Sequence, residues 1–192
     1  MRKGSIALTL LSILCLAGCG EGKNESLLCV EKDGTVKSYI VEDFTASYYN
    51  ADELKESVTQ DILSFNEDYD NVAVELTNFE AGEGILRATI EYQSAEAYEE
   101  FNEETMSFGL LAEVSEKYDI DADFYDVKNM ENKLDFSDIT DENYNIMIFT
   151  EPVSVKVPGK VLYISDGLQK GNSSKSVTVT DDKEEIYYIV YE

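Results

Sequence analysis

The segment NADELKESVTQDILSF, residues 50–65, decides the fold class because it contains the clearest helical pattern in the chain. Its apolar residues recur at spacings of three and four, which places them on one face of an α-helix. These residues are Leu54, Val58, Ile62 and Phe65. Asn50 can cap the helix, with Glu53 three residues later as an approximate capping box. The pattern predicts a helix over residues 51–65 with one face against a core.

Two predicted β-hairpins flank this helix. The first covers residues 27–41 and turns at Asp33-Gly34, a dipeptide that suits the positive φ angles of a tight turn. The second covers residues 72–92, where apolar residues alternate with polar ones on either side of AGEG, residues 81–84. A helix that is apolar on one face would pack on a sheet built from such hairpins.

Two shorter helices are expected after the second hairpin. One starts at Ser94 and runs to about Asn102, with Tyr98 and Phe101 on its apolar side and glutamates on its exposed side. Another is expected near residues 109–117, with Leu111 and Val114 turned inward.

The last third of the chain is rich in strand-like runs. These runs are Asn145–Thr150, Val153–Val157, Lys160–Ser165, Lys175–Thr180 and Glu185–Tyr191. The links between them are short, which predicts antiparallel pairing, and Pro158-Gly159 suits a type II turn. Before these runs, residues 126–143 are polar and poorly periodic, which predicts a surface loop or a sub-boundary near 127–143.

Together these elements predict an α+β fold, with two or three helices packed on an antiparallel sheet and a β-rich C-terminal third. Residues 27–192 are expected to form a single α+β ectodomain.

The N-terminal region has the pattern of an export signal. Met1, Arg2 and Lys3 form a positive tip, and residues 6–16 form an apolar run of about eleven residues. That run is too short to span a bilayer, which takes about 20 residues. Residues 1–18 are therefore expected to be a signal peptide.

The four residues that end this region are Leu16, Ala17, Gly18 and Cys19. They resemble the lipobox of bacterial lipoproteins, in which a branched apolar residue and two small residues precede a cysteine. The resemblance implies that Cys19 receives a diacylglyceryl group and becomes the first mature residue. The small and polar residues that follow it predict a flexible tether over residues 19–26. Two acyl chains hold a protein stably at a membrane. The resemblance therefore places the body on the outer face of the bacterial cytoplasmic membrane; an ordinary secretory signal is the alternative.

Several segments of the body resemble small uncharacterised lipoproteins of low-GC Gram-positive gut bacteria. They are KDGTV, VEDF, YYNADELK, VPGKVLYISD and IYYIVYE. This second resemblance agrees with the expected location and implies no activity and no catalytic residues.

The charge of the chain excludes some partners. The formal net charge is −25, and loss of residues 1–18 removes two basic residues but none of the 40 acidic ones, giving −27. Such a surface repels nucleic acids, so no nucleic-acid partner is expected. Cations or basic proteins are favoured by charge, although solubility alone also explains an acidic surface.

Few residues suggest catalysis. The chain has no histidine, which excludes a Ser-His-Asp triad and most zinc sites. Cys29 lies in the apolar stretch LLCV and is expected to be a buried, unreactive thiol. No catalytic residue and no cofactor are therefore predicted, although paired carboxylates could hydrolyse a glycan.

A weak metal candidate remains. Asp119, Asp121 and Asp123 resemble the start of a calcium-binding EF-hand loop, but Phe124 and Met130 occupy the positions of its glycine and glutamate. Alternation of these acids with apolar residues favours a strand with one wet face instead.

The tyrosines allow two interpretations. Exposed tyrosines serve well in recognition, whereas β-propensity by itself enriches tyrosine in strands. In an extended chain the members of Tyr48-Tyr49 and of Tyr187-Tyr188 point to opposite faces, so at most one of each pair is expected in the core.

The leading hypothesis is a lipid-anchored envelope protein that binds or scaffolds another component without catalysis. Its partner would be a protein, a glycan or a small ligand, in addition to the membrane lipid of its covalent anchor. The alternatives are a small solute-binding lipoprotein and a carboxylate-dependent wall or glycan hydrolase.

Overall fold

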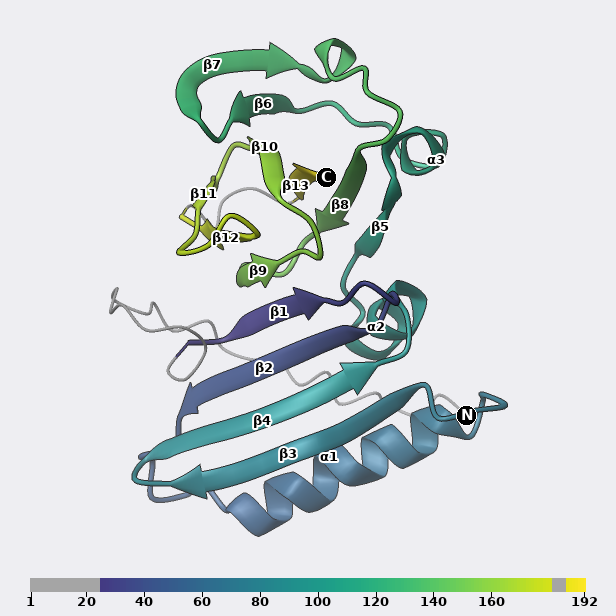
Figure 1. Ribbon diagram of the computed structural model, residues 1–192. Helices are drawn as coiled ribbons and strands as arrows, with labels where there is room; N and C mark the ends of the chain where they lie inside the picture. The colour runs from purple at the N-terminus through teal and green to yellow at the C-terminus, as the bar shows by residue number, and fades with distance from the viewer. Residues whose placement is uncertain (1–24, 181–185) are drawn as a thin grey trace.

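The computed structural model describes residues 25–180 and 186–192, and within these ranges the chain forms helices and two β-sheets (Figure 1). The helices are α1 (Ala51–Asn66), α2 (Ala95–Asn102), α3 (Leu111–Ser115) and a short 3-10 helix, η1 (Phe136–Asp138). The predicted α+β class with a sheet-rich body is confirmed, and the strands are divided between two sheets.

Sheet A has the strand order β11-β12-β9-β1-β2-β4-β3. Its strands are β1 (Leu27–Val30), β2 (Val36–Asp43), β3 (Val74–Gly82), β4 (Ile85–Tyr92), β9 (Ser154–Lys156), β11 (Leu168–Lys170) and β12 (Ser176–Val179). Both predicted hairpins are present, as the antiparallel pairs β1–β2 and β3–β4. Glu83 and Gly84 turn the second hairpin with φ angles of 55° and 77°, and positive φ at both residues is typical of two-residue hairpin turns.

Sheet B has the strand order β5-β8-β13-β10-β6-β7, and its pairs are antiparallel. Its strands are β5 (Met106–Leu110), β6 (Asp123–Asp126), β7 (Asn129–Asp135), β8 (Asn145–Phe149), β10 (Val161–Ser165) and β13 (Tyr187–Tyr191). In Figure 1 it lies on the β1–β9 side of sheet A, while α1 lies beside β3.

The main core lies on one face of sheet A, called here the inner face. Residues Leu28, Val30 and Val155 of this face belong to the same buried cluster as Phe149 and Ile189 of sheet B. Helix α1 packs against β3, and α2 lies against β4 and β5. The helices and sheet B therefore cover the same face of sheet A.

The predicted helices are confirmed in position. Asn50 caps α1, because its side-chain oxygen accepts hydrogen bonds from the N–H groups of Asp52 and Glu53 at 3.1 and 3.3 Å. Ile62 of the predicted apolar face is buried. Helix α2 matches its predicted bounds and is capped by Ser94, whereas α3 is shorter than expected.

Strand β13 lies inside sheet B and contributes to two cores. Tyr187 and Ile189 face the main core, while Tyr188 and Val190 face a second core that includes Phe124 and residues of α3. The expectation that at most one of Tyr187 and Tyr188 is in the core is therefore wrong, since both are buried. The reason is that both faces of this strand are covered, so alternation no longer separates core from solvent.

The C-terminal strands pair with one another in antiparallel fashion, as expected. Their division between two sheets was not expected. Strand β9 lies in sheet A and pairs in parallel with β1, although β8 and β10 on either side of it in the sequence lie in sheet B. Pro158 and Gly159 do not form a type II turn, because Gly159 lacks the positive φ which that turn requires. The chain instead passes from one sheet to the other at these residues.

The polar segment over residues 126–143 is not an uninterrupted loop. Asn129–Asp135 forms β7, the edge strand of sheet B, and η1 follows it. Most residues of β7 are exposed, so the strand carries no apolar alternation to reveal it. The strand predicted from the alternation over residues 119–124 begins only at Asp123.

Strands from both sides of residues 127–143 pair with each other in each sheet, as β1 with β9 and β5 with β8. The single-domain organisation of residues 27–192 remains a prediction that agrees with these pairings.

Candidate functional site

The residues of the expected lipid anchor lie outside the described residues. They are Leu16, Ala17, Gly18 and Cys19. The described chain enters sheet A through Ser26, whose hydroxyl donates to the carbonyl oxygen of Val41 at 3.2 Å and accepts from the Val41 N–H at 3.0 Å. Ser26 lies seven positions after Cys19 in the sequence. An extended chain of that length spans at most about 25 Å. In the described ranges, no helix is both long enough and apolar enough to cross a membrane.

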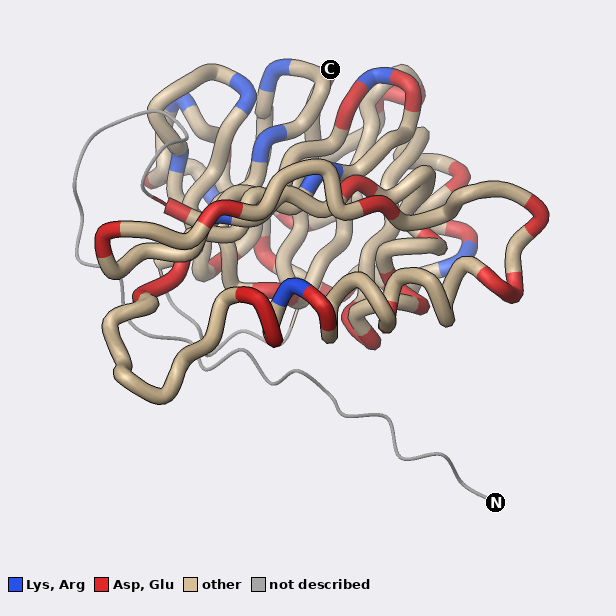
Figure 2. Tube along the Cα trace, turned by 90° about the horizontal axis from the view of Figure 1, so that it is seen from below, with Lys and Arg blue, Asp and Glu red and all other residues tan. Residues whose placement is uncertain are grey.

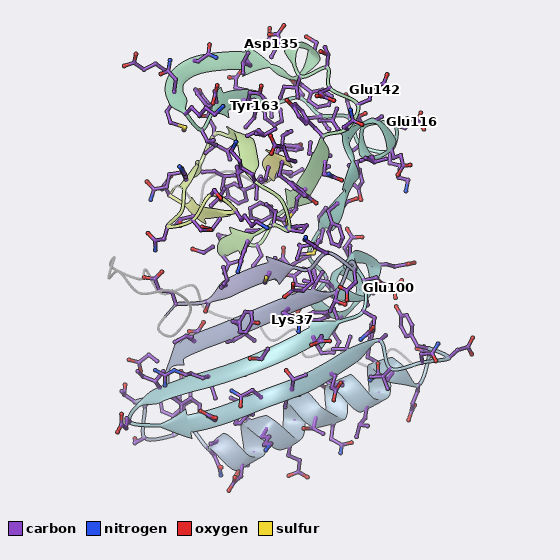
Figure 3. All side chains as sticks on the ribbon, viewed as in Figure 1. Lys37, Glu100, Glu116, Asp135, Glu142 and Tyr163 are labelled. Carbon is purple, nitrogen blue, oxygen red and sulfur yellow. The ribbon has the colours of Figure 1, made fainter. Side chains whose placement is uncertain are left out.

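The three aspartates of the weak calcium candidate are not brought together in one depression. Asp121 and Asp123 line a shallow depression of about 380 Å³ beside Asp135, whereas Asp119 lines a neighbouring one of about 450 Å³. Asp123 also forms an ion pair with Lys133 at 2.6 Å. Across residues 25–180 and 186–192, no group of three or more cysteine or acidic side chains has the arrangement of a metal site. Figure 3 shows Asp135 near the end of β7, at the far side of sheet B from sheet A.

The face of sheet A opposite the inner face is called here the open face. Strand registers place Lys156, Cys29, Lys37, Glu91 and Glu75 in one row across five neighbouring strands of this face. None of these five residues belongs to either hydrophobic core described above. The row therefore runs from basic to acidic across the sheet.

Charges on the open face are partly paired. The Lys37 ammonium lies 3.1 Å from the Glu91 carboxylate, and both side chains are about a quarter to a third exposed, at 30% and 26%. Figure 3 shows Lys37 over strands β2 and β4. Figure 2 shows acidic residues over much of the trace, with many of the fewer basic residues toward the upper side of the view. The row on the open face carries two lysines and two glutamates in a strongly acidic chain.

Cys29 lies between the two lysines of this row and is buried. Burial raises the pKa of its thiol, as does the nearby charge of Glu31, while Lys156 and Lys37 act in the opposite direction. The thiol is therefore protonated near neutral pH and is a poor nucleophile.

A second group of residues joins α2 to the link between β8 and β9. This tyrosine–carboxylate cluster consists of Tyr98, Glu104, Thr150 and Glu151. The Tyr98 hydroxyl donates a hydrogen bond to the Glu151 carboxylate, and the Thr150 hydroxyl donates to Glu104 at 2.6 Å. The N–H of Thr105 donates to the Thr150 hydroxyl at 3.1 Å. The cluster therefore ties the helix on sheet A to the chain that leaves sheet B.

Burial and charge perturb the groups of this cluster. Burial raises the pKa of the Glu151 carboxyl, the hydrogen bond from Tyr98 lowers it, and the charge of Glu104 raises it further. Burial also raises the pKa of Tyr98. Two carboxyl groups in different environments can divide the roles of acid and of base or nucleophile between them.

Sequence reasoning missed this cluster. It assigned Tyr98 to the core and placed Glu104 on an acidic surface, while Glu151 separated two predicted strands. Tyr98 and Glu151 are 53 positions apart. No local pattern signals their contact, because it arises from the passage of the chain between the sheets.

Replacing Glu151 with glutamine should stabilise the protein at neutral pH but not in acid. Because the folded-state pKa lies above the ordinary value of 4.5, the folded chain binds this proton more tightly than the unfolded chain does. The loss of folding stability caused by ionisation of Glu151 is thus absent below about pH 4.5. It grows as the pH rises through the pKa of Glu151 in the folded protein. Urea unfolding between pH 4 and about pH 8 should show the stability difference between variant and wild type increasing with pH.

The exposed Glu56 of α1 provides the control, since Glu56→Gln removes the same charge away from the cluster. A stability difference for Glu151→Gln that stays constant with pH would contradict the assigned role of burial.

Comparison with known proteins gives no relative from which a function could be inferred. No protein-family model, no curated protein and no solved structure matches the chain.

Proposed function

We propose that this chain is a lipid-anchored protein of the outer face of a bacterial cytoplasmic membrane, and that its body binds or scaffolds another envelope component without catalysis. The observation that carries the proposal is the lipobox-like sequence Leu16-Ala17-Gly18-Cys19, followed after a short polar tether by a folded sheet. A tether of at most about 25 Å would keep the body close to the membrane surface. The open face supports the binding role, because it offers paired and unlike charges on a broad strand surface.

Replacement of Cys19 by serine tests the anchor. Serine has no thiol to acylate, so the variant is expected to leave the membrane fraction almost completely, whereas the wild type stays with it. Mass spectrometry of the N-terminal peptide should show the mass of the acyl groups on wild-type Cys19 alone. Cys29→Ser is the matched control, since it removes the buried thiol and should leave the protein in the membrane fraction. Membrane retention of the Cys19 variant would contradict the proposal.

Partner binding can be measured separately in cells that produce the wild type or the Cys19→Ser variant. Crosslinking on intact cells should join the wild type to a defined envelope component, and the Cys19 variant should lose that product because it no longer resides at the membrane. A crosslinked product that is equally abundant for both forms would argue against a membrane-bound scaffold.

A second candidate function is a carboxylate-dependent hydrolase of wall polymer or another glycan. The observation that favours it is the tyrosine–carboxylate cluster, in which Glu151 has a raised pKa and Glu104 is exposed. Purified protein would then release soluble fragments from cell-wall polymer, and both Glu151→Gln and Glu104→Gln would abolish that release. Such turnover would overturn the noncatalytic proposal.

A further inference from the structure

An exposed aromatic group lies in the link between β2 and α1. We define residues 44–49 as the aromatic loop. Tyr48 is 80% exposed and Tyr49 is 46% exposed, although both carry large apolar rings. The rings of Phe44 and Tyr49 are stacked with centroids 4.9 Å apart, and the Tyr48 ring meets Tyr49 edge-on at 4.8 Å. The loop thus presents a joined aromatic surface to solvent.

Hydrogen bonds hold this loop in place on the sheet. The Phe44 N–H donates to the carbonyl oxygen of Gly84 at 2.8 Å, which fixes the loop to the β3–β4 turn. The Thr45 hydroxyl donates to the Asp43 carboxylate at 2.6 Å, and the Tyr49 N–H donates to the Ala46 carbonyl oxygen at 3.0 Å. An aromatic surface held in one conformation loses little conformational entropy on binding.

The loop lies at the end of sheet A where the chain arrives from Cys19. Ser26 is bound to Val41, and the loop begins at Phe44, three residues further along the chain. A strand advances about 3.3 Å per residue, so the loop begins about 10 Å from the point of entry. In Figure 1 the start of β1, the end of β2, the β3–β4 turn and the start of α1 lie at the same side of the molecule. A bilayer that holds Cys19 is therefore within reach of the loop.

Tyrosine rings favour the interface between lipid and water, because the ring is apolar and the hydroxyl remains hydrated. A short tether raises the effective concentration of the loop at the bilayer, so that weak insertion suffices. Acidic residues surround the loop, among them Glu42, Asp43 and Asp52. These charges should disfavour anionic lipid and leave a zwitterionic surface as the better partner.

We propose that the aromatic loop inserts into the headgroup region of the bilayer that carries the Cys19 anchor, with Tyr48 deepest, and thereby holds the body in one orientation. This inference rests on the proposed lipid anchor. In that orientation the far end of α1, followed by Val72, points away from the membrane.

The absence of tryptophan from the sequence allows a direct test, since Tyr48→Trp introduces a single fluorescent reporter. The chain from Cys19 to Glu192 is coupled through the Cys19 thiol to a maleimide phospholipid in phosphatidylcholine vesicles, while Cys29 is protected by burial. The tryptophan emission should shift to the blue and be quenched by brominated lipid. Val72→Trp is the matched control, because Val72 is also apolar and is 57% exposed. Its emission should remain that of a hydrated tryptophan.

Unquenched emission of Tyr48→Trp would overturn the proposal. Equal quenching of Tyr48→Trp and Val72→Trp would overturn it as well, because it would mean that the body has no fixed orientation. Replacing part of the phosphatidylcholine with phosphatidylglycerol should weaken the quenching of Tyr48→Trp, and stronger quenching would overturn the charge argument. Because the lipid is attached chemically, this result does not depend on acylation in cells. Failure of the loop to insert is thus distinguishable from failure of Cys19 to be acylated.

Discussion

Phe149→Ala is expected to lower the free energy of unfolding by about 3–5 kcal/mol, the range for removal of a buried phenylalanine side chain. Phe149 is fully buried at the end of β8 and pairs with Met106 of β5 and Tyr187 of β13. Its ring lies 5.2 Å from the ring of Tyr187. Alanine would leave a cavity where sheet B meets the inner face of sheet A, and strands on both sides restrict its collapse.

Such a loss is a large part of the total stability of a domain, which is about 5–15 kcal/mol. Urea unfolding followed by circular dichroism would measure it. Tyr48→Ala removes an aromatic ring of similar size that is 80% exposed, so its effect should stay within about 0.5 kcal/mol. Equal losses for the two variants would contradict the assignment of Phe149 to the shared core.

Gly159→Ala is the second substitution expected to have a large effect, with a loss of about 1–3 kcal/mol or more from overpacking. A Cβ atom at Gly159 would lie 1.4 Å from the carbonyl oxygen of Glu192, so the backbone must move. The end of the chain is held there, because the Glu192 N–H donates to the carbonyl oxygen of Lys160 at 3.0 Å. Gly159 lies where the chain passes from sheet A to sheet B, so a shift of its backbone would disturb both sheets.

Gly82→Ala is the matched control. Nothing lies within 4 Å of a Cβ atom at Gly82, and its φ angle is not positive, so alanine should cost no stability there. Deleting Glu192 from the Gly159→Ala variant should restore part of the lost stability. In the wild type the same deletion only removes the hydrogen bond from Glu192 to Lys160. A double-mutant cycle of thermal midpoints measures this coupling, and additive effects would show that the chain end is not the obstacle.

The candidate sites differ in how far the sequence could reveal them. The proposed anchor depends on four adjacent residues, and Leu16 to Cys19 carry its whole signal. The tyrosine–carboxylate cluster has no such signal, since α2 and the β8–β9 link meet only in the folded chain. Likewise, the exposed position of Tyr48 depends on how the β2–α1 link closes over the β3–β4 turn.

The sequence by itself determined the local elements of this protein. The periodicity of residues 51–65 defined α1, alternation around two turns defined the hairpins of sheet A, and five apolar runs marked strands in the last third of the chain. Local patterns suffice for α1 and the hairpins because each of these elements buries one face more than the other, so the spacing of apolar residues records its geometry. The buried strands of sheet B are instead marked by short apolar runs between turn residues.

Only the tertiary structure decided how the strands divide between the sheets. The parallel pairing of β9 with β1, the burial of both Tyr187 and Tyr188, and the exposed edge strand β7 all escaped the sequence patterns. The physical reason is that strand partners are chosen by hydrogen bonding and packing between distant segments. A strand covered on both faces, or exposed on both, has no alternation from which its place could be read.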